Sequence, residues 1–461
     1  MTADQRKNIT IALQEIQNEL PTNQLVYEGV FVWPIIKYHL FMLVRGNSLN
    51  DVNIVEMSEQ KVNEPLNAFK KIARKVRVAY KYFYLTKFYF RKNELLSTGS
   101  WAHRVFENKM WLNRYFINSK KKRIHFEYAS LEEKYLAFNS NVDLRNNTFS
   151  AEDLFYFHQH YFSKHRQVKL DSSELIKKIV DLFNLKTGLN FEYTAFNRKI
   201  NNVLAWADLW QKILDGVNPK EVRIVCYYGI AMYGLCIAAN RKSIPVIDIQ
   251  HGGFGNLNPD YLNFGTIPKD TFSSMPSHFS VWNLSSKQHL EKEQIVNSEN
   301  ILLEGNPWVT YNQQKFHQPN EKQKNTIVYT LQTTVEIPSF MTDVIRESSA
   351  SIKWVLKTHP RMTNSEIETV RTNFWELIQQ NNIEINSETY LLKLLKAAKV
   401  HVSGFSGSVI EAGLLEIPTI INNRTGLETY KTLIETQPSL YKYAETKEEF
   451  LKSLESFISI Q

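Results

Sequence analysis

The chain has 461 residues, of which 43% are hydrophobic and 22% charged, with two cysteines and a formal net charge of +8. This composition excludes a globally disordered chain, and two thiols exclude a disulfide framework, so we expect a folded protein of the reducing cytoplasm. The length exceeds that of one ordinary core and favours two domains, while neither a signal-peptide pattern nor an apolar run of about 18 residues is found.

The positive charge is concentrated in residues 70–125, where Lys and Arg are interleaved with Tyr and Phe. Such a stretch can be a solvated helix face above an aromatic core stripe, or it can dock on an anionic membrane or polysaccharide. No nucleic-acid-binding module accompanies the charge, so we expect no nucleic-acid partner. A peripheral position on the inner face of the cytoplasmic membrane is therefore one expectation, and a plain solvated helix is the other.

In chain order, residues 1–50 predict a long helix, a turn at 20–23 and a second helix that ends near residue 47. A short strand is predicted at 93–97 and a helix over 172–185. The pattern becomes clearer over 222–250, where a β-branched run, a helical segment and a second buried run follow one another. This βαβ unit implies a parallel sheet.

The same alternation of strands and helices recurs after residue 325. Strands are predicted over 325–332, 352–360, 383–386, 399–404 and 418–422, and helices over 340–349, 365–380, 389–398 and 408–416. The pattern predicts a second doubly wound α/β domain, with the polar stretch 313–324 as the crossover. We expect domains at 1–310, with a basic and helical insertion over about 50–200, and at 311–445, followed by a helix at 446–461. Ligands would bind between them, beyond the carboxyl ends of the strands.

The first predicted strand end with polar residues is Gln250-His251-Gly252-Gly253. An imidazole titrates near neutrality and can accept a proton from an attacking hydroxyl. The two glycines allow a ligand to approach the backbone closely. His251 is therefore a candidate catalytic base, and a purely structural hydrogen-bonding role is the alternative.

Two further strand ends are candidates for binding phosphate. Lys357, His359, Pro360 and Arg361 place cationic side chains at a turn fixed by proline, which suits a leaving group whose negative charge grows in the transition state. The alternative is a solvated basic turn.

The third strand end carries small hydroxyl residues and a glycine before a helix. Ser403, Ser406, Gly407 and Ser408 precede or open the predicted helix that contains Glu411. Free backbone N–H groups at such a helix start can bind an anion, and Ser406 or Ser408 can also serve as the N-cap. Glu411 could accept hydrogen bonds from a ribose.

With these motifs the chain resembles the bacterial GT-B transferases of surface-polysaccharide assembly, which include capsule Kdo transferases, sialyltransferases and teichoic-acid polymerases. The residues that carry the resemblance are Gln250-His251-Gly252, His359-Pro360, and Ser406 with Ser408. The chain departs from the sialyltransferase pattern in two places: Gln250 and His251 stand where an acidic pair is usual, and Gly407 separates the two serines.

The resemblance implies a fold, a reaction and roles for particular residues. The fold would be GT-B, two Rossmann-like doubly wound domains facing a central cleft, with the acceptor on the N-terminal domain and the nucleotide sugar on the C-terminal one. His251 would be the general base, and His359 would steady the departing phosphate. Lys357 and Arg361 flank His359 and are added on the ground of their charge, not of the resemblance. The donor would be CMP-Kdo, CMP-sialic acid or another CMP-nonulosonate, and the acceptor an oligosaccharide or lipid-linked glycan.

No Asp-x-Asp motif is present, so we expect neither a metal nor another cofactor. A single displacement with inversion is preferred; a retaining route would need a carboxylate such as Asp248 or Asp260. Three alternatives stay open: transfer of a polyol phosphate from a CDP-polyol, epimerisation of a nucleotide sugar, and a non-enzymatic basic binding protein.

Overall fold

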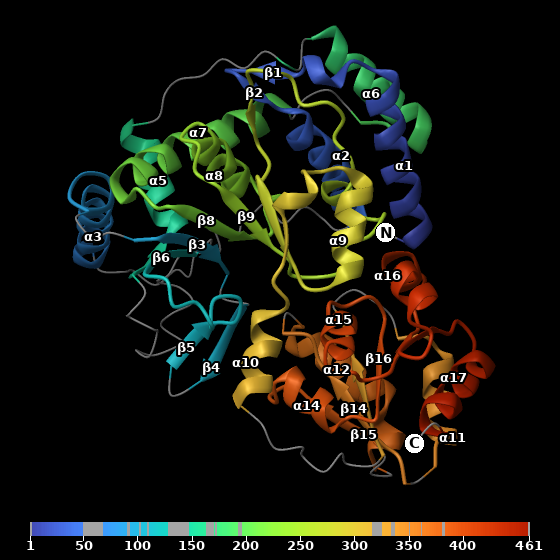
Figure 1. The fold of residues 1–461 in the computed structure, drawn as a ribbon. Coiled ribbons are helices and arrows are strands. Elements are labelled where there is room, and N and C mark those ends of the chain that lie inside the picture. The colour runs from blue at the N-terminus through green and yellow to red at the C-terminus, as the bar shows by residue number, and fades with distance from the viewer. Residues whose placement is uncertain are drawn as a thin grey trace.

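The structure is a computed structural model that describes residues 2–48, 68–89, 93–100, 103–107, 110–127, 147–162, 170, 173–191, 196–315, 325–332, 337–349, 351–360, 362–379 and 383–459. Two separate parallel sheets dominate it (Figure 1). The predicted fold class, two doubly wound α/β sheets of the GT-B type, is confirmed. In the described part of the chain, no helix is both long and apolar enough to cross a membrane.

The N-terminal sheet has the strand order β12-β11-β9-β8-β3-β6-β7, and all its neighbours are parallel. Its strands are β3 (Leu95–Gly99), β6 (Arg123–Glu127), β7 (Asn147–Ser150), β8 (Glu221–Val225), β9 (Val246–Ile249), β11 (His278–Val281) and β12 (Ile301–Leu303). The helices of this half are α1 (Ala3–Glu19), α2 (Trp33–Ser48), α3 (Ala68–Lys87), α5 (Ala151–Phe162), α6 (Glu174–Thr187), α7 (Phe196–Val217), α8 (Ile230–Asn240) and α9 (Leu284–Glu293). Short strands β1 (Val26–Tyr27), β2 (Val30–Phe31) and β10 (Phe272–Ser273) form a second small sheet, and β4 (Arg104–Glu107) and β5 (Met110–Asn113) form a hairpin.

The C-terminal sheet has the order β15-β14-β13-β16-β17-β18 and is also parallel throughout. Its strands are β13 (Thr326–Thr330), β14 (Lys353–Lys357), β15 (Ile383–Asn386), β16 (Val400–Ser403), β17 (Thr419–Ile421) and β18 (Tyr441–Tyr443). The helices are α10 (Pro307–Lys315), α11 (Phe340–Glu347), α12 (Asn364–Asn373), α13 (Trp375–Gln379), α14 (Leu391–Ala397), α15 (Ser408–Gly413), α16 (Arg424–Thr436) and α17 (Lys447–Ser459). Alternate residues of β13 enter different cores: Ile327 joins one apolar cluster and Val328 another, as expected for a sheet covered on both faces.

The region expected as an insertion, about 50–200, differs from that expectation. It supplies β3, β6 and β7, and β3 lies inside the N-terminal sheet between β8 and β6. Helix α7 then packs closely on α8: a Cβ added to Gly234 would lie 2.7 Å from Cβ of Trp206 and 2.8 Å from the backbone nitrogen of Ala207. Only glycine permits this approach, which explains why an otherwise apolar helix carries one there.

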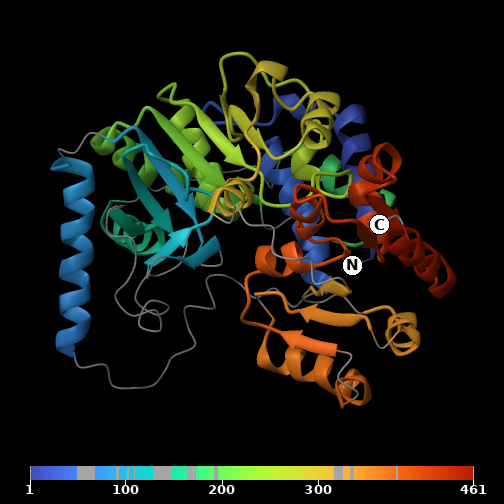
Figure 2. The same cartoon turned by 60° about the horizontal axis from the view of Figure 1, so that its bottom comes forward.

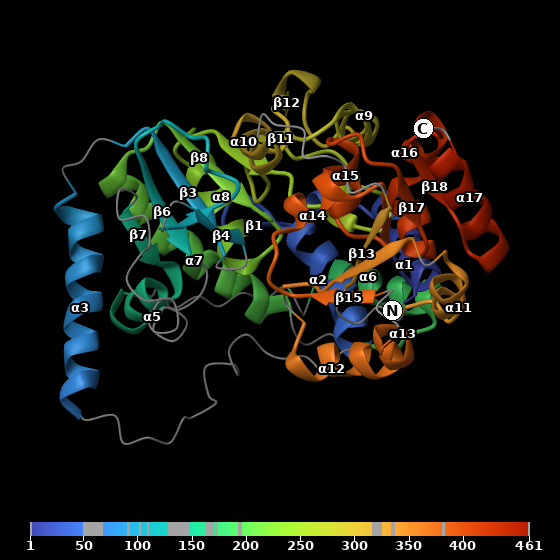
Figure 3. The same cartoon turned by 90° about the horizontal axis from the view of Figure 1, so that it is seen from below.

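The two sheets share an apolar cluster between them. From the N-terminal half it contains Tyr115, Phe116, Val225, Ile249 and Trp282, and from the C-terminal half Val409, Ile410, Ile421, Tyr430, Leu433 and Tyr441. Helix α1 also contacts α16, where Lys7 and Glu428 form an ion pair of 3.1 Å. Figure 3, a view from below, shows the N-terminal helix beside the C-terminal elements.

The order of the strands locates the places where a ligand can bind. In the C-terminal sheet the chain builds outward from β13 to β14 and β15, and then returns to the other side of β13 with β16. The corresponding reversal in the N-terminal sheet lies between β3 and β8. Crevices at the carboxyl ends of strands open at such reversals, which are flanked by the loops after β3, β8, β13 and β16. The loop after β9 lies one strand further along the N-terminal sheet.

Candidate active site

The loop after β9 and the loop after β16 touch each other across the two sheets. A Cβ added to Gly407 would lie 3.3 Å from Cα of Gly252 and 3.5 Å from the carbonyl oxygen of His251. Two of the three motifs predicted from the sequence, far apart along the chain, therefore lie side by side. Figure 1 shows α15 and α16 on the side of the C-terminal sheet that is nearest the N-terminal sheet.

His251 is half-buried and is hydrogen-bonded to a tyrosine that the sequence analysis did not select. Its Nε2 lies 3.1 Å from the hydroxyl of Tyr228, which follows β8. Burial, with Cys226 and Tyr38 adding to it, raises the pKa of Tyr228 well above its usual value, so the phenol keeps its proton. The His251 Nδ1 is buried. Proton exchange at His251 would therefore use Nε2, beside a neutral phenol.

Gln250 is fully buried and holds the loop from inside. Its Nε2 donates to the carbonyl of Gly252 and to Oγ of Ser286, each at 2.8 Å, and its Oε1 accepts from the backbone N–H of Trp282 at 2.7 Å. The side-chain amide of Gln250 bonds to protein groups through both its nitrogen and its oxygen. Gln250 therefore positions the loop, and the expectation that it faces an acceptor is not what the structure shows.

The two glycines after His251 have different surroundings. A Cβ at Gly252 would meet no atom within 4 Å, so a ligand could approach the backbone there. A Cβ at Gly253 would lie 2.6 Å from Cε1 of Tyr430 and 2.8 Å from Cγ2 of Thr429. Gly253 thus serves the packing of the loop against α16, and only Gly252 is open in the way predicted for both.

The three serines of the loop after β16 also differ in their surroundings. Ser403 and Ser408 are buried, and the hydroxyl of each lies 2.9 Å from Oγ1 of Thr330. Both hydroxyls therefore stabilise the junction of β13, β16 and α15, and the expected phosphate contact from them is not supported. Ser406 is half-buried, and its Oγ accepts the N–H of Ser408 at 3.3 Å. The N-cap of α15 is Gly407, without a side-chain cap, so neither predicted serine caps the helix.

Glu411 points into the contact between the halves. It is buried, and Asn306 donates from Nδ2 to its Oε1 at 3.4 Å. Burial raises the pKa of Glu411, while the charge of Arg114 and the hydrogen bond from Asn306 act against that rise. Arg114 follows the β4–β5 hairpin and donates to the hydroxyl of Tyr115 at 2.8 Å. In this arrangement Glu411 serves the interface, where the sequence analysis expected a ribose.

The basic motif lies on the far side of β13 from the serine loop. Lys357 ends β14, and its Nζ donates to the carbonyl of Ser387 at 2.8 Å; burial lowers its pKa to about 8. His359 follows, half-buried, in a turn closed by the hydrogen bond from the N–H of Met362 to its carbonyl at 2.9 Å. Pro360 is exposed, and Arg361 lies outside the described residues. The ammonium group of Lys357 is thus bonded within its own sheet, and among the described cationic side chains of the motif His359 is the more exposed.

A small hollow occupies the reversal point of the C-terminal sheet. It is lined by the ends of β13, β16 and β17 and by the segment before α11: Tyr329, Thr330, Leu331, Gln332, Ile337, Pro338, Gly404, Asn422 and Asn423. The Oε1 of Gln332 accepts the N–H of Phe405 at 3.3 Å, which ties this hollow to the serine loop. Gln332 and Asn422 were not selected from the sequence, because they end the strands predicted over 325–332 and 418–422. In the structure β13 ends at Thr330 and β17 at Ile421, so both residues lie beyond their strands.

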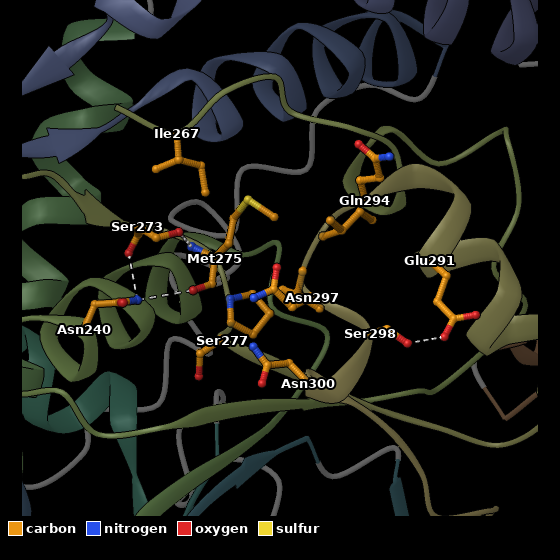
Figure 4. Close-up of a pocket in the computed structure, with 13 residues that line it drawn as sticks. Asn240, Ile267, Ser273, Met275, Ser277, Glu291, Gln294, Asn297, Ser298 and Asn300 are labelled. Carbon is orange, nitrogen blue, oxygen red and sulfur yellow. Dashed lines mark hydrogen bonds between the residues drawn. The ribbon is translucent and has the colours of Figure 1, made fainter. Parts of the chain in front are cut away.

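A larger cavity, of about 640 Å³, lies elsewhere (Figure 4). It is bordered by Ser277 and Asn300, which precede β11 and β12, and by Asn240 at the end of α8. These positions are at the amino ends of the strands, opposite His251. None of the residues selected from the sequence lines it. In the described ranges, no group of three or more His, Cys, Asp or Glu residues could hold a metal ion.

No protein-family model and no curated protein matches the chain. Among solved structures, a UDP-GlcNAc 2-epimerase from Neisseria meningitidis bound to UDP-GlcNAc is 12% identical, over 79% of this chain and 91% of that one, with a TM-score of 0.45. A putative UDP-N-acetylglucosamine 2-epimerase from Listeria monocytogenes is 12% identical, over 80% and 89%, with a TM-score of 0.46. A wall teichoic acid polymerase is 11% identical, over 85% and 89%, with a TM-score of 0.40. At these values the likenesses assign neither a substrate nor an activity to the chain.

Proposed function

We propose that the chain is a glycosyltransferase that moves a sugar from a nucleotide donor to a glycan acceptor, with His251 as the general base. The observation that carries the proposal is the contact between the His251–Gly252 loop and the Ser406–Gly407 loop at the carboxyl ends of two parallel sheets. A proton-accepting side chain on one sheet thus lies next to a small, glycine-containing loop on the other. Bringing an acceptor and a donor together needs such a pair of surfaces.

In the proposed reaction the acceptor hydroxyl gives its proton to Nε2 of His251 while its oxygen attacks the anomeric carbon. The bond between that carbon and the phosphate oxygen of the donor breaks, and the electron pair leaves with the nucleotide. Before the acceptor binds, Tyr228 holds the imidazole through its 3.1 Å contact with Nε2, and the phenol has to turn aside as the acceptor hydroxyl takes that position. Because Tyr228 stays neutral, it adds no charge beside the incipient imidazolium. The attack from the face opposite the leaving group inverts the anomeric centre.

The leaving phosphate would bind at the C-terminal sheet. Ser406, Gly407 and Gln332 lie around the reversal point, and His359 lies one strand further along the sheet edge. A neutral or protonated imidazole and the hydroxyl of Ser406 can hold a phosphate without a metal. The backbone N–H groups of Ser408, Val409 and Ile410, which open α15, are already bonded within the loop. The resemblance to surface-polysaccharide transferases supports a CMP-activated nonulosonate or Kdo as donor and an oligosaccharide or lipid-linked glycan as acceptor.

The test is release of nucleotide from a panel of donors by the purified chain, with and without a glycan acceptor and with EDTA present. We expect acceptor-dependent CMP release from a CMP-sugar. Release from CDP-polyols alone would replace sugar transfer by polyol-phosphate transfer, and conversion of a UDP-sugar without acceptor would replace it by epimerisation.

The variant His251→Ala should abolish transfer without loss of folding. The matched control is His278→Ala, which removes a half-buried histidine at the opposite, amino end of a neighbouring strand. Equal activity of the two variants would remove the role proposed for His251.

A further inference from the structure

Helix α3 presents a stripe of apolar side chains to solvent. Ile72, Val76, Tyr80 and Phe83 are 60%, 63%, 68% and 40% exposed, and their spacing of four, four and three residues places them on one face of the helix. The opposite face is anchored by Tyr82 and Leu85, which are buried in the N-terminal core. Figure 2 shows α3 standing at the outer side of the N-terminal half, remote from the C-terminal sheet.

The stripe continues onto α5. The ring of Phe83 lies 6.3 Å from that of Phe162, and the ring of Phe157 lies 4.8 Å from that of Tyr161. Tyr161 and Phe162 are themselves exposed. The two helices therefore form one aromatic and aliphatic surface, which we call the α3–α5 surface and define by Ile72, Val76, Tyr80, Phe83, Tyr161 and Phe162.

The charge on α3 has a single sign. Its twenty residues include seven Lys and Arg and no Asp or Glu. Lys75 and Arg77 are exposed beside the apolar stripe. An exposed apolar stripe on a helix whose own charges are all positive fits an interface that is apolar below and anionic at its surface.

The second basic run of the sequence, residues 120–123, does not extend this surface. Lys121 forms an ion pair of 2.7 Å with Glu221, and Arg123 is buried, donating from Nη1 to the carbonyl of Phe116 at 2.6 Å. Two of these four cations therefore serve the fold.

We propose that the α3–α5 surface docks the protein on a bilayer that contains anionic phospholipid. Helix α3 lies along the headgroup region, its apolar stripe enters the acyl boundary with the exposed aromatic rings at the interface, and its cations contact lipid phosphates. A nucleic-acid site would use the cations but would leave the apolar stripe in water. The docking goes beyond the proposed transfer reaction and does not depend on it.

The test is co-sedimentation of the full chain with vesicles of phosphatidylcholine, with and without phosphatidylglycerol. We expect binding to the mixed vesicles that weakens with salt, and little binding to phosphatidylcholine alone. The double variant Val76→Glu/Tyr80→Glu should lose binding. Its control is Leu185→Glu, which places the same charge at a 79% exposed leucine of α6 and should bind as the wild type does.

A second variant separates charge from apolar contact. Lys75→Glu/Arg77→Glu removes two cations and should weaken binding to mixed vesicles by at least about 25-fold, at roughly fivefold per cation. Circular dichroism and the nucleotide-release assay would check that each variant folds. Unchanged binding of Val76→Glu/Tyr80→Glu, equal binding to both kinds of vesicle, or binding to RNA without binding to vesicles would each overturn the proposal.

Discussion

Replacing each of the adjacent glycines of the His251 loop by alanine should have different effects: loss of stability at Gly253 and loss of activity at Gly252. In Gly253→Ala the new Cβ would lie 2.6 Å from Cε1 and 2.7 Å from the hydroxyl of Tyr430. Tyr430 is buried and donates to the carbonyl of Ser406 at 2.7 Å, so it has little freedom to retreat. Overpacking of this kind costs about 1–3 kcal/mol of unfolding free energy.

In Gly252→Ala the same methyl group meets no atom within 4 Å. We therefore expect the unfolding free energy to change by no more than about 0.5 kcal/mol, as for an ordinary surface substitution. Transfer should nevertheless fall, because the methyl group would occupy the space through which a substrate approaches the backbone beside His251.

Urea unfolding followed by circular dichroism gives the stabilities, and acceptor-dependent nucleotide release gives the activities. The expected pattern is a destabilised Gly253→Ala and a stable but poorly active Gly252→Ala. Equal losses of stability in Gly252→Ala and Gly253→Ala, or unfolding of Gly253→Ala at the wild-type urea concentration, would refute the steric difference between the two glycines.

Three further predictions concern individual side chains. Tyr228→Phe should lower the rate of transfer by about tenfold or more, through loss of the group that orients His251, yet cost only about 0.5–1.5 kcal/mol of stability, and full activity would show that Nε2 needs no such partner. Ser403→Ala should lower the unfolding free energy by about 1–3 kcal/mol, because it removes a buried partner of Thr330. Ser406→Ala should raise the KM for the donor and leave the stability unchanged. The reverse result would contradict a structural role for Ser403 and a binding role for Ser406. Lys357 has a folded-state pKa of about 8, below that of the unfolded chain, so the unfolded chain binds more protons above pH 8 and stability from this group rises with pH. Between pH 8 and 9.5 the unfolding free energy of the wild type should rise by about 1–2 kcal/mol relative to that of Lys357→Met. The same difference in stability between the two proteins at both pH values would contradict this.

Most strands of the C-terminal sheet were predictable, because buried parallel strands are short β-branched runs. The run at 400–403 and the run at 246–249 are of this kind, and each was placed within a few residues. In the N-terminal sheet the sequence predicted β3, β8 and β9 and missed β6, β7, β11 and β12. A single helix was predicted over 365–380, and the structure has α12 and α13 with a break at Phe374, whose φ of −110° and ψ of 15° are not helical. Local propensity does not reveal such a break, since the apolar spacing continues across it.

The candidate site was predictable in position and less so in detail. The rule that polar residues after a buried strand are functional selected His251 and Ser406, and the structure brings their loops together. The same rule selected Gln250 and Ser403, which are buried and serve the fold. Whether such a side chain faces a ligand or serves the fold depends on the direction in which it points. That direction is set by partners from distant parts of the chain, Trp282 for Gln250 and Thr330 for Ser403. No pattern within one loop contains that information.

The apolar cluster shared by the two sheets couples the unfolding of the two halves. Tyr115 and Trp282 on one side and Val409 and Tyr430 on the other have no core of their own to enter if the halves separate. Cutting the chain between the sheets would leave each fragment with an exposed apolar and aromatic surface, so neither fragment should be soluble alone. Heating the intact chain should accordingly give one cooperative transition, with both sheets melting together.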